Sequence, residues 1–398
     1  MKKHASLGVL FATVFMDLVG FGIVLPLLPF MAKHFDASAL MVSALSSIFS
    51  LMQFLCAPFW GRLSDRIGRR PVLLWSLAGS TISYLLLGFC SSFAQIFATR
   101  ALAGFFGANI SVASAYIADI TPPEKRSRGM GMIGAAFGLG FVFGPLIGGL
   151  IAQFGSDSAR PEQVYRMIGW VAAAICGLNF LVACFNLPES RRPESAPAPS
   201  KSLVPFSSWR RAFAVRAVGM LILLYFVFGF AFSNFESLFA LLLKTHFAYD
   251  VREANYFFFF IGLVVAGVQG GLIGRLVKRY GESRLILAGG FLFIASLALM
   301  PLARGAPMLL VALFGLGVGQ GLNRSSVLGL ISQQVSMDEQ GLVMGVAQSS
   351  GSLARILGPL IGGALYDVSV AAPFLFASAL VLVCLLATRH ILPEPVPA

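Results

Sequence analysis

The sequence predicts an all-α polytopic membrane protein, with twelve transmembrane helices arranged as two pseudo-symmetric six-helix bundles. Composition and the spacing of apolar runs lead to this fold class. Of the 398 residues, 57% are hydrophobic and only 12% are charged, whereas a soluble domain carries about 25% charged residues. The apolar runs have the length, about 20 residues, that a helix needs to cross a bilayer.

Six apolar runs fill the first half of the chain, and short polar loops separate them. Their approximate bounds are Leu7–Phe30, Ser38–Trp60, Val72–Cys90, Phe93–Asp119, Arg128–Gln153 and Tyr165–Leu187. The start, Met1-Lys2-Lys3, resembles the charged end of a signal peptide. However, the first run continues past Asp17 to Phe30 without a small-residue cleavage site, so we expect a retained first helix.

A polar, proline-rich segment at Pro188–Arg211 has the composition of a linker rather than of a span. Six more apolar runs follow it, at about Phe213–Lys244, Val251–Arg275, Leu285–Ala303, Met308–Gln334, Gly341–Tyr366 and Ala372–His390. The predicted domains are therefore an N-terminal bundle at 1–187, a cytoplasmic linker at 188–212 and a C-terminal bundle at 213–398.

The two halves repeat each other. Three pairs of segments match at nearly the same shift: Gly61–Gly68 with Gly274–Gly281, Gly107–Asn109 with Gly321–Asn323, and Gly144–Gly149 with Gly358–Gly363. Parallel repeats of this kind are typical of transporters that bind substrate between their halves near the bilayer midplane, and open the site to each side by rocking. Lys278 stands where Asp65 does, so the two inner loops are not chemically equivalent.

Basic residues predict the orientation in the membrane. The formal net charge is +12, but the lysines and arginines lie in short loops rather than on one patch, which excludes a nucleic-acid partner. Most of these loops fall on one side if the spans alternate, and positive short loops stay cytoplasmic. We therefore expect both termini in the cytoplasm, although the short loop Ser336–Gln340 is acidic. The trimmed loops suit a bacterial inner, or cytoplasmic, membrane.

Several kinds of site find no support in the sequence. The five cysteines lie inside apolar runs without Cys-x-x-Cys spacing, which supports neither a disulfide framework nor a zinc site. There is no phosphate-cradling loop, metal-ligand cluster or nucleophile constellation. We therefore expect no enzymatic activity, no metal and no cofactor. The expected partners are a small-molecule substrate, protons and the lipid bilayer, and the chain is expected to work as a monomer.

The loop Gly61–Pro71 reads Gly-Arg-Leu-Ser-Asp-Arg-Ile-Gly-Arg-Arg-Pro. It resembles the loop 2–3 signature of the major facilitator superfamily, and the resemblance implies a gating role. Asp119, at the inner end of the fourth run, resembles the acid that pairs with the loop arginines in that family. The resemblance thus implies a cytoplasmic latch made of Gly61, Asp65, Arg66, Arg69 and Asp119. The alternative is an ordinary positive-inside anchor with no gating role.

The fifth run is rich in glycine at small-x-x-x-small spacing, which allows close contact between helices. Its segment Gly140-x-x-x-Gly144-Pro145-x-x-Gly148-Gly149 resembles the motif that separates proton-driven antiporters from other facilitators. That resemblance implies proton antiport, with Gly144 and Pro145 as gating residues. A plain packing face is the alternative.

The first run narrows the resemblance. Met16–Pro29 looks like helix 1 of the tetracycline/proton antiporters and their drug-exporting relatives, and the likeness continues through most of the first half. The tetracycline exporters carry an acid in helix 3 just before a Tyr-Leu-Leu-Leu run, where this chain has Ser83 before Tyr84. The residues therefore favour a broader drug or metabolite exporter over an exporter of a tetracycline–metal chelate.

Ionisable side chains inside spans are costly and are functional candidates by default. Asp17 lies about 10 residues, or roughly 15 Å, into the first run, and Glu236 lies past the middle of the seventh. A carboxyl group that is neutral in one orientation and ionised in the other can exchange a proton for a substrate. The alternative for Asp17 is a packing hydrogen bond to a neighbouring Ser or Asn. Arg100 matches the arginine that antiporters of this superfamily place near the proton site, which implies that it tunes a carboxylate; otherwise it snorkels.

The proton-coupling candidates are thus Asp17, Glu236 and Arg100. The substrate-binding candidates are Asp17, Glu236, Arg355, Asn109, Asn234 and Gln269. Arg355 is deep in the eleventh run and could be a counter-ion or a ligand for an anionic substrate. The amides could bind a ligand, although membrane Asn and Gln more often bridge helices.

The predicted function is proton-coupled efflux of a small amphipathic drug or metabolite by alternating access. One alternative is a proton-coupled importer or facilitator of a metabolite, in which Arg355 and Arg100 hold an anionic substrate. Another is a sensor or scaffold with a facilitator body, which has no need for gating loops or span-buried acids.

Overall fold

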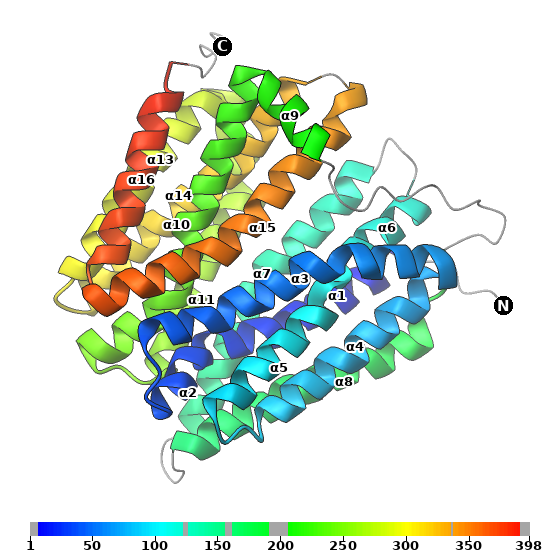
Figure 1. Cartoon of the computed structure of the whole chain (residues 1–398), viewed down its shortest axis with the longest axis vertical. Coiled ribbons are helices and arrows are strands. Elements are labelled where there is room, and N and C mark those ends of the chain that lie inside the picture. The colour runs from blue at the N-terminus through cyan, green and yellow to red at the C-terminus, as the bar shows by residue number, and fades with distance from the viewer. Residues whose placement is uncertain (1–6, 122–125, 156–160, 191–205, 336, 391–398) are drawn as a thin grey trace. The chain divides into compact units, whose positions relative to one another are not determined.

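The computed structural model describes residues 7–121, 126–155, 161–190, 206–335 and 337–390. Every regular element in those residues is a helix (Figure 1). This confirms the all-α class that the composition predicts.

The helices of the first half correspond to the six expected runs. They are α1 (Leu7–Val24), η1 (Leu25–Leu27), α2 (Leu28–His34), α3 (Ala39–Ile67), α4 (Arg69–Leu87), α5 (Phe93–Phe106), η2 (Gly107–Asn109), α6 (Ile110–Ile120), α7 (Arg126–Gly155) and α8 (Pro161–Asn186). Pro26 and Pro29 lie at the starts of η1 and α2, because proline fits the first turn of a helix and breaks the turns before it.

The helices of the second half follow the same plan, with one addition. They are α9 (Phe206–Ala214), α10 (Arg216–Phe247), α11 (Val251–Gly267), the π-helical η4 (Val268–Leu272), α12 (Ile273–Tyr280), α13 (Glu282–Leu299), η5 (Met300–Leu302), α14 (Ala306–Gln333), α15 (Met337–Val368) and α16 (Ala372–Thr388). The addition is α9, a short helix that overlaps the end of the segment predicted as a linker and the start of the next expected run. Residues 1–6 and 191–205, with the signal-peptide-like start and most of that linker, lie outside the described residues.

Nine helical stretches in the described part of the chain are long and apolar enough to cross a membrane. They are Leu7–His34, Ala39–Ile67, Phe93–Ile120, Met132–Gln153, Glu162–Asn186, Arg216–Phe247, Val251–Tyr280, Glu282–Leu302 and Ala306–Gln333. The chain is therefore a multi-pass membrane protein. The criteria of helix length and hydropathy leave out three of the expected spans: α4, α15 and the 17-residue α16. The full count of twelve spans therefore remains a prediction.

Two glycines turn the chain at equivalent places of the repeat. Gly68 separates α3 from α4 with φ +104°, and Gly281 separates α12 from α13 with φ +75°. A side chain at such a φ clashes with the backbone, so glycine is the residue that the turn requires. The two glycines occupy matching positions in the repeated loops, so the repeat extends to backbone conformation.

Packing divides the chain into two compact units. One contains residues 1–36, 48–203 and 250–259, and the other contains 37–47, 204–249 and 260–398. These units draw mainly on the first and second halves, but each also takes a short segment from the other half. The predicted bundle boundaries at 187 and 213 stay a prediction.

In the first unit, α1 packs along α7 and α8, and α4 packs along α5 and α8. A cluster that includes Trp60, Leu77, Val112 and Tyr116 forms part of its core. In the second unit, α10 packs along α14, α15 and α16, while α13 packs along α14 and α16. These contacts fix the helices that carry the candidate residues.

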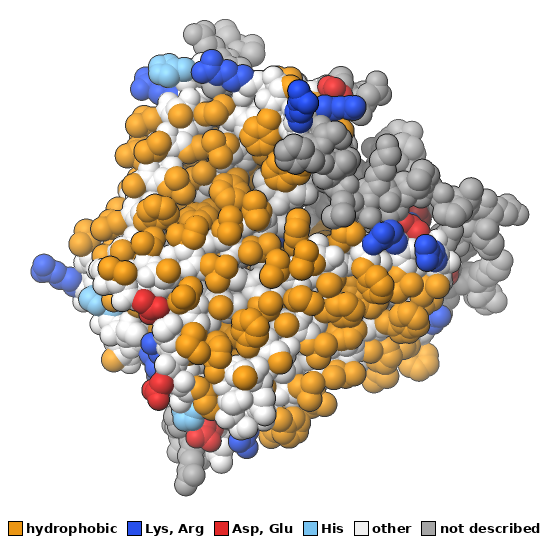
Figure 2. All heavy atoms as spheres, in the orientation of Figure 1, with side chains coloured by type: hydrophobic (Ala, Val, Ile, Leu, Met, Phe, Trp, Pro, Cys, Tyr) orange, Lys and Arg blue, Asp and Glu red, His pale blue; other side chains and the backbone are white. Residues whose placement is uncertain are grey.

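Large apolar side chains also cover the outside of the protein. Leu55 is 58% exposed, Phe185 75% and Val383 65%, and Figure 2 shows hydrophobic side chains over much of the visible face. In water such a surface would be an aggregation hazard, whereas in a bilayer it is the solvated surface. The exterior thus supports the membrane assignment independently of helix length.

Candidate functional site

Asp17 lies on α1 opposite the break in the fourth expected span. There η2 interrupts the helix with a 3₁₀ turn, and Asn109 at its end donates a 3.3 Å hydrogen bond from Nδ2 to Oδ2 of Asp17. Ser80 of α4 also hydrogen-bonds the carboxylate, and Tyr84 and Cys176 lie near enough to interact with it electrostatically. The candidate residues Asp17 and Asn109, 92 positions apart, are therefore direct neighbours. This contact agrees both with a proton carrier and with the packing alternative.

Arg100 of α5 is buried, with 1% of its surface exposed. Its guanidinium carbon lies 4.5 Å from the ring centroid of Phe49 and 5.7 Å from that of Phe21. In the described residues it forms no ion pair, and its Nε atom has no hydrogen-bond partner. A snorkelling side chain would extend to the helix end instead of stacking on rings. The described residues show no direct contact between Arg100 and a carboxylate that would support the expected tuning role.

Glu236 lies on α10 in the second unit and is half-buried. Arg355 of α15 and Arg324 of α14 are both close enough to interact electrostatically with its carboxylate. Both arginines are exposed although they lie well inside their helices, and Arg355 donates a 3.1 Å hydrogen bond to Ser352. The sequence identified Glu236 and Arg355 but missed Arg324. The available signal was its place directly after the repeated Gly321-x-Asn323 motif.

The two remaining amide candidates differ in their settings. Asn234 is buried and donates a 3.2 Å hydrogen bond to the backbone carbonyl of Pro373, which joins α10 to α16. That is the helix-bridging role that membrane asparagines commonly have. Gln269 lies in the π-helical turn η4 and is half-buried. Such turns occur frequently at functional sites, so Gln269 keeps its candidate status for a reason that the sequence did not indicate.

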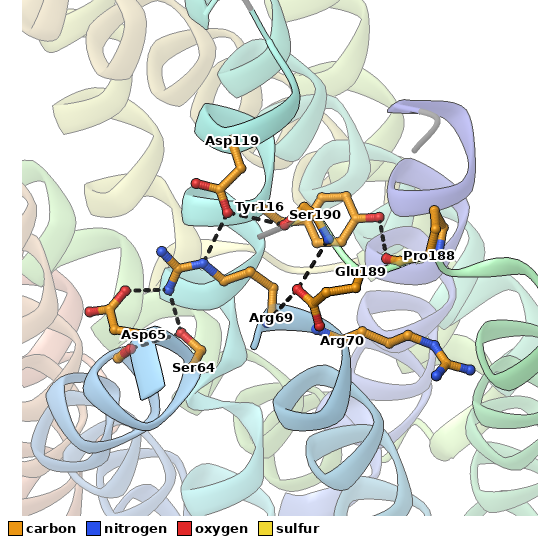
Figure 3. Close-up of polar contacts among 10 residues, drawn as sticks. Ser64, Asp65, Arg69, Arg70, Tyr116, Asp119, Pro188, Glu189 and Ser190 are labelled. Carbon is orange, nitrogen blue, oxygen red and sulfur yellow. Dashed lines mark hydrogen bonds and ion pairs between the residues drawn. The ribbon is translucent and has the colours of Figure 1, made fainter. Parts of the chain in front are cut away.

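Three of the five residues that the resemblance assigns to a latch, Asp65, Arg69 and Asp119, lie in contact around the turn between α3 and α4. Nη1 of Arg69 lies 2.6 Å from Asp65, and its Nε lies 3.1 Å from Asp119 on α6. Nη1 also donates to the Ser64 hydroxyl at 2.6 Å (Figure 3). Arg69 therefore ties three helices together within the first unit. Of the other predicted members, Arg66 is exposed, and an added Cβ at Gly61 would meet nothing within 4 Å.

The segment after α8 also contacts this charged cluster, and the sequence analysis missed it. Glu189 accepts hydrogen bonds from the backbone N–H groups of Arg69 at 2.9 Å and Arg70 at 3.1 Å. Ser190 donates a 3.0 Å bond to Asp119, and the Tyr116 hydroxyl donates to the Pro188 carbonyl (Figure 3). A carboxylate at the start of a helix satisfies free N–H groups and complements the helix dipole. Here it holds the start of α4 in the first unit.

Gly144 and its neighbours form a contact between α7 and α1. A Cβ at Gly144 would lie 2.6 Å from Cα of Gly22, and one at Gly140 would lie 2.7 Å from Cβ of Leu18. Pro145 lies inside α7, which continues through it. The glycine run is thus a close packing face, and that face holds the helix that bears Asp17.

No group of three or more His, Cys, Asp or Glu in the described residues could hold a metal ion.

Comparisons with known proteins agree with this arrangement. The sequence profile of the Major Facilitator Superfamily matches residues 10–303 and 270–398. Tetracycline resistance protein, class C, of Escherichia coli is 35% identical over 397 residues, which is 98% of each chain. The crystal structure of the human organic anion transporter MFSD10 (TETRAN) is 29% identical with a TM-score of 0.68, and covers 96% of this chain and 98% of that chain. The nucleoside transporter NupG, 12% identical with a TM-score of 0.76 over 98% and 99% of the two chains, shows the fold alone.

The family match and the relatives identify this helical multi-pass protein as a membrane transporter, not an enzyme. The chain belongs to the Major Facilitator Superfamily. Within it, the chain is similar to the tetracycline resistance proteins, which confirms the resemblance noted in its first span and its first cationic loop.

Proposed function

We propose that this protein exports a small amphipathic drug or metabolite in exchange for protons. Asp17 and Glu236 carry the protons, and binding of the substrate is coupled to loss of a proton from one or both carboxyl groups. The protein works as a monomer in the inner membrane with both termini in the cytoplasm. One charge that moves through 100 mV contributes about 2.3 kcal/mol to the drive.

The observation that carries this proposal is the setting of Asp17. Its hydrogen-bond partners, Asn109 and Ser80, are neutral donors, and it forms no ion pair in the described part of the chain. A carboxyl group held in this way can gain or lose a proton without breaking an ion pair. It is therefore suited to a transport cycle in which its charge changes at every turn.

Glu236 differs in a useful way. Arg355 and Arg324 both lie close enough to interact electrostatically with its carboxylate, so Glu236 shares its surroundings with two cations. Binding of an acidic substrate group at those arginines would then compete with Glu236. The two carboxyl groups would thus respond to different parts of one substrate, or to two steps of one cycle.

The relatives support export and leave the substrate open. The tetracycline resistance proteins are similar over nearly the whole chain, while a human relative is described as an organic anion transporter. This chain has Ser83 where the tetracycline exporters carry their helix 3 acid. We therefore propose a substrate other than a tetracycline–metal chelate, with Arg69, Asp65 and Asp119 closing the cytoplasmic side between cycles.

The direct test is transport in proteoliposomes with an imposed pH gradient. A lipophilic cation, a neutral amphipath and an aromatic acid would each be supplied, and movement would be compared with and without a protonophore. Substrate movement opposite to the proton gradient that collapses with the protonophore supports export. Movement in the same direction as protons would replace exchange with proton-coupled import, and movement that ignores the gradient would indicate a facilitator.

A further inference from the structure

A buried cation without an anion stands out in the first unit. Arg100 exposes 1% of its surface, and its Nε atom has no hydrogen-bond partner. None of the ion pairs in the described residues includes Arg100. Burying a charge is costly unless it is paired and hydrogen-bonded. An anion bound from outside the chain would offset the cost of burying this guanidinium group.

Among the described residues of this unit, no neighbouring side chain supplies that anion. Asp17 is held by Asn109 and Ser80 instead. Tyr84 is the titratable side chain close enough to interact electrostatically with Arg100, and a phenol is neutral at ordinary pH. The partner must therefore come from outside the described chain or from another state of it.

Two aromatic rings lie beside the guanidinium group, and a third ring packs against one of them. The guanidinium group of Arg100 lies over the ring of Phe49 of α3, and the ring of Phe21 of α1 lies beside it at a slightly longer distance. The ring centroids of Phe21 and Phe49 are 5.0 Å apart, and Phe21 meets Phe141 of α7 edge to face at 6.0 Å. All three rings are half-buried. Stacking covers the faces of a guanidinium group and leaves its N–H edge free to donate.

The packing of α5 on α3 holds this stack in place. Gly104, one turn after Arg100, lies so close to α3 that an added Cβ would be 2.9 Å from Cα of Phe49. Gln53 of α3 also donates a 2.8 Å hydrogen bond to the Gly107 carbonyl at the end of α5. Arg100 is thus preorganised on rigid helices, which reduces the cost of ordering it when a ligand arrives.

We propose that the acidic group of the transported compound is the missing anion. A carboxylate or similar oxyanion accepts hydrogen bonds from the N–H edge of Arg100, and the apolar body of the compound lies on Phe21, Phe49 and Phe141. This inference rests on the proposed transport function and names its substrate class as amphipathic aromatic acids, zwitterions included. Arg100 then binds substrate directly rather than acting through a carboxylate of the protein.

The test compares an acid with its uncharged twin. Purified protein in detergent is titrated by calorimetry with 2-naphthoate and with methyl 2-naphthoate, which differ in the acidic group alone. The variants are Arg100→Gln, Arg100→Lys and, as a control, Arg304→Gln at an exposed arginine outside the stack. Charge-assisted hydrogen bonds lead us to expect that the wild type and the control bind the acid about 10- to 100-fold more tightly than the ester.

The ratio of the two affinities is the readout, because a merely structural role for Arg100 would weaken both ligands equally. Arg100→Gln should bring the ratio close to one. Arg100→Lys, which keeps the charge but loses the planar fork, should leave an intermediate ratio, and it remains informative if Arg100→Gln does not fold. A wild type that binds neither compound, an acid/ester ratio of one in the wild type, or a ratio unchanged by both substitutions would overturn the proposal.

This binding experiment uses no proton gradient, so its result on the anion site is independent of whether the protein exchanges protons for substrate. Acid binding through Arg100 without proton-coupled movement would reject the exchange mechanism and leave the anion site. Proton-coupled transport with no preference for the acid would reject the anion site and leave the exchange mechanism.

Discussion

Asn109 donates a hydrogen bond to Asp17 across 3.3 Å, from a 3₁₀ turn between α5 and α6 to the middle of α1. The break in the helix brings a side-chain amide to a carboxylate that has neutral hydrogen-bond partners. This pair links the sequence motif around Asp17 to the proposed exchange of protons.

Replacing Asn109 with alanine tests whether the pair has a role beyond packing. We expect proton-coupled transport to fall, by about 10- to 150-fold for the loss of a hydrogen bond to a charged group, with a small change in thermal stability. Asn179→Ala is the matched control, because Asn179 is a buried amide of the same unit that donates a 2.8 Å bond to the Thr13 carbonyl. The control should lower the melting temperature and leave transport per folded molecule unchanged. Equal transport losses in both variants would assign Asn109 to packing.

The latch at Arg69 predicts a functional loss larger than its effect on stability. Arg69 contacts Asp65 and Asp119, whose side chains are 25% and 28% exposed, and such pairs contribute about 0.2–1 kcal/mol. Arg69→Gln and Asp119→Asn should therefore lower the free energy of unfolding by less than about 1 kcal/mol. Transport should fall by about tenfold or more if closure of the cytoplasmic side needs this pair.

A double-mutant cycle checks that prediction. If Arg69 and Asp119 act as one pair, the Arg69→Gln/Asp119→Asn double variant should transport as fast as whichever single variant has the lower transport rate. Independent, multiplicative losses would show that the two residues do not act as one latch.

The contact of α7 with α1 predicts a strong position effect for one small substitution. Gly144→Ala places a Cβ 2.6 Å from Cα of Gly22, and overpacking of this kind costs about 1–3 kcal/mol. Gly134→Ala in the same helix meets nothing within 4 Å and should be neutral. Thermal unfolding and vesicle transport of the two variants measure the difference. Tolerance of Gly144→Ala would contradict the close packing face.

Substitutions at the two glycine turns distinguish the stability cost of backbone strain from that of a side-chain clash. Gly68→Ala and Gly281→Ala both force alanine into a positive φ, at a cost of about 1–2 kcal/mol. At Gly68 the new Cβ would also lie 2.5 Å from Oε2 of Glu189, while at Gly281 it meets nothing within 4 Å. Gly68→Ala should therefore destabilise the protein more, and Glu189→Ala should remove the excess. Equal effects of the two substitutions would mean that Glu189 does not clamp the turn.

The sequence predicted the helical class well because lipid leaves a helix few alternatives for its backbone groups. Run lengths located most helix bounds within a few residues, and the repeat of Gly61–Gly68 at Gly274–Gly281 is matched by a positive φ at Gly68 and at Gly281. The helix α9 was missed because its nine residues, Phe206–Ala214, are too few and too polar to register as a span. The proline-rich run Pro193–Lys201 has the composition of a linker, and we therefore assigned the residues after it to the same linker.

The candidate site was predictable as a set of residues but not as a set of contacts. Asp17, Arg100 and Glu236 stood out because charge inside a span is rare. Sequence distance hid their partners: Asn109 lies 92 positions from Asp17. The sequence led us to expect a carboxylate beside Arg100, but in the described residues its neighbours are the rings of Phe21 and Phe49. These rings come from two other helices, so their position in the sequence did not reveal the contact. Arg324 and Glu189 were missed since each lies close to other polar residues near a helix end or motif, where charge is common.

The most direct test of the exchange mechanism is proton release caused by substrate in proteoliposomes that contain a pH-sensitive dye. The account predicts that a transported compound releases protons with the wild type, that Asp17→Asn abolishes the signal while the compound still binds, and that Glu236→Gln weakens or abolishes it. If Asp17→Asn and Glu236→Gln both released protons as the wild type does, or if the wild type moved the compound with no proton signal, the carboxyl groups would be structural and the exchange mechanism would be wrong.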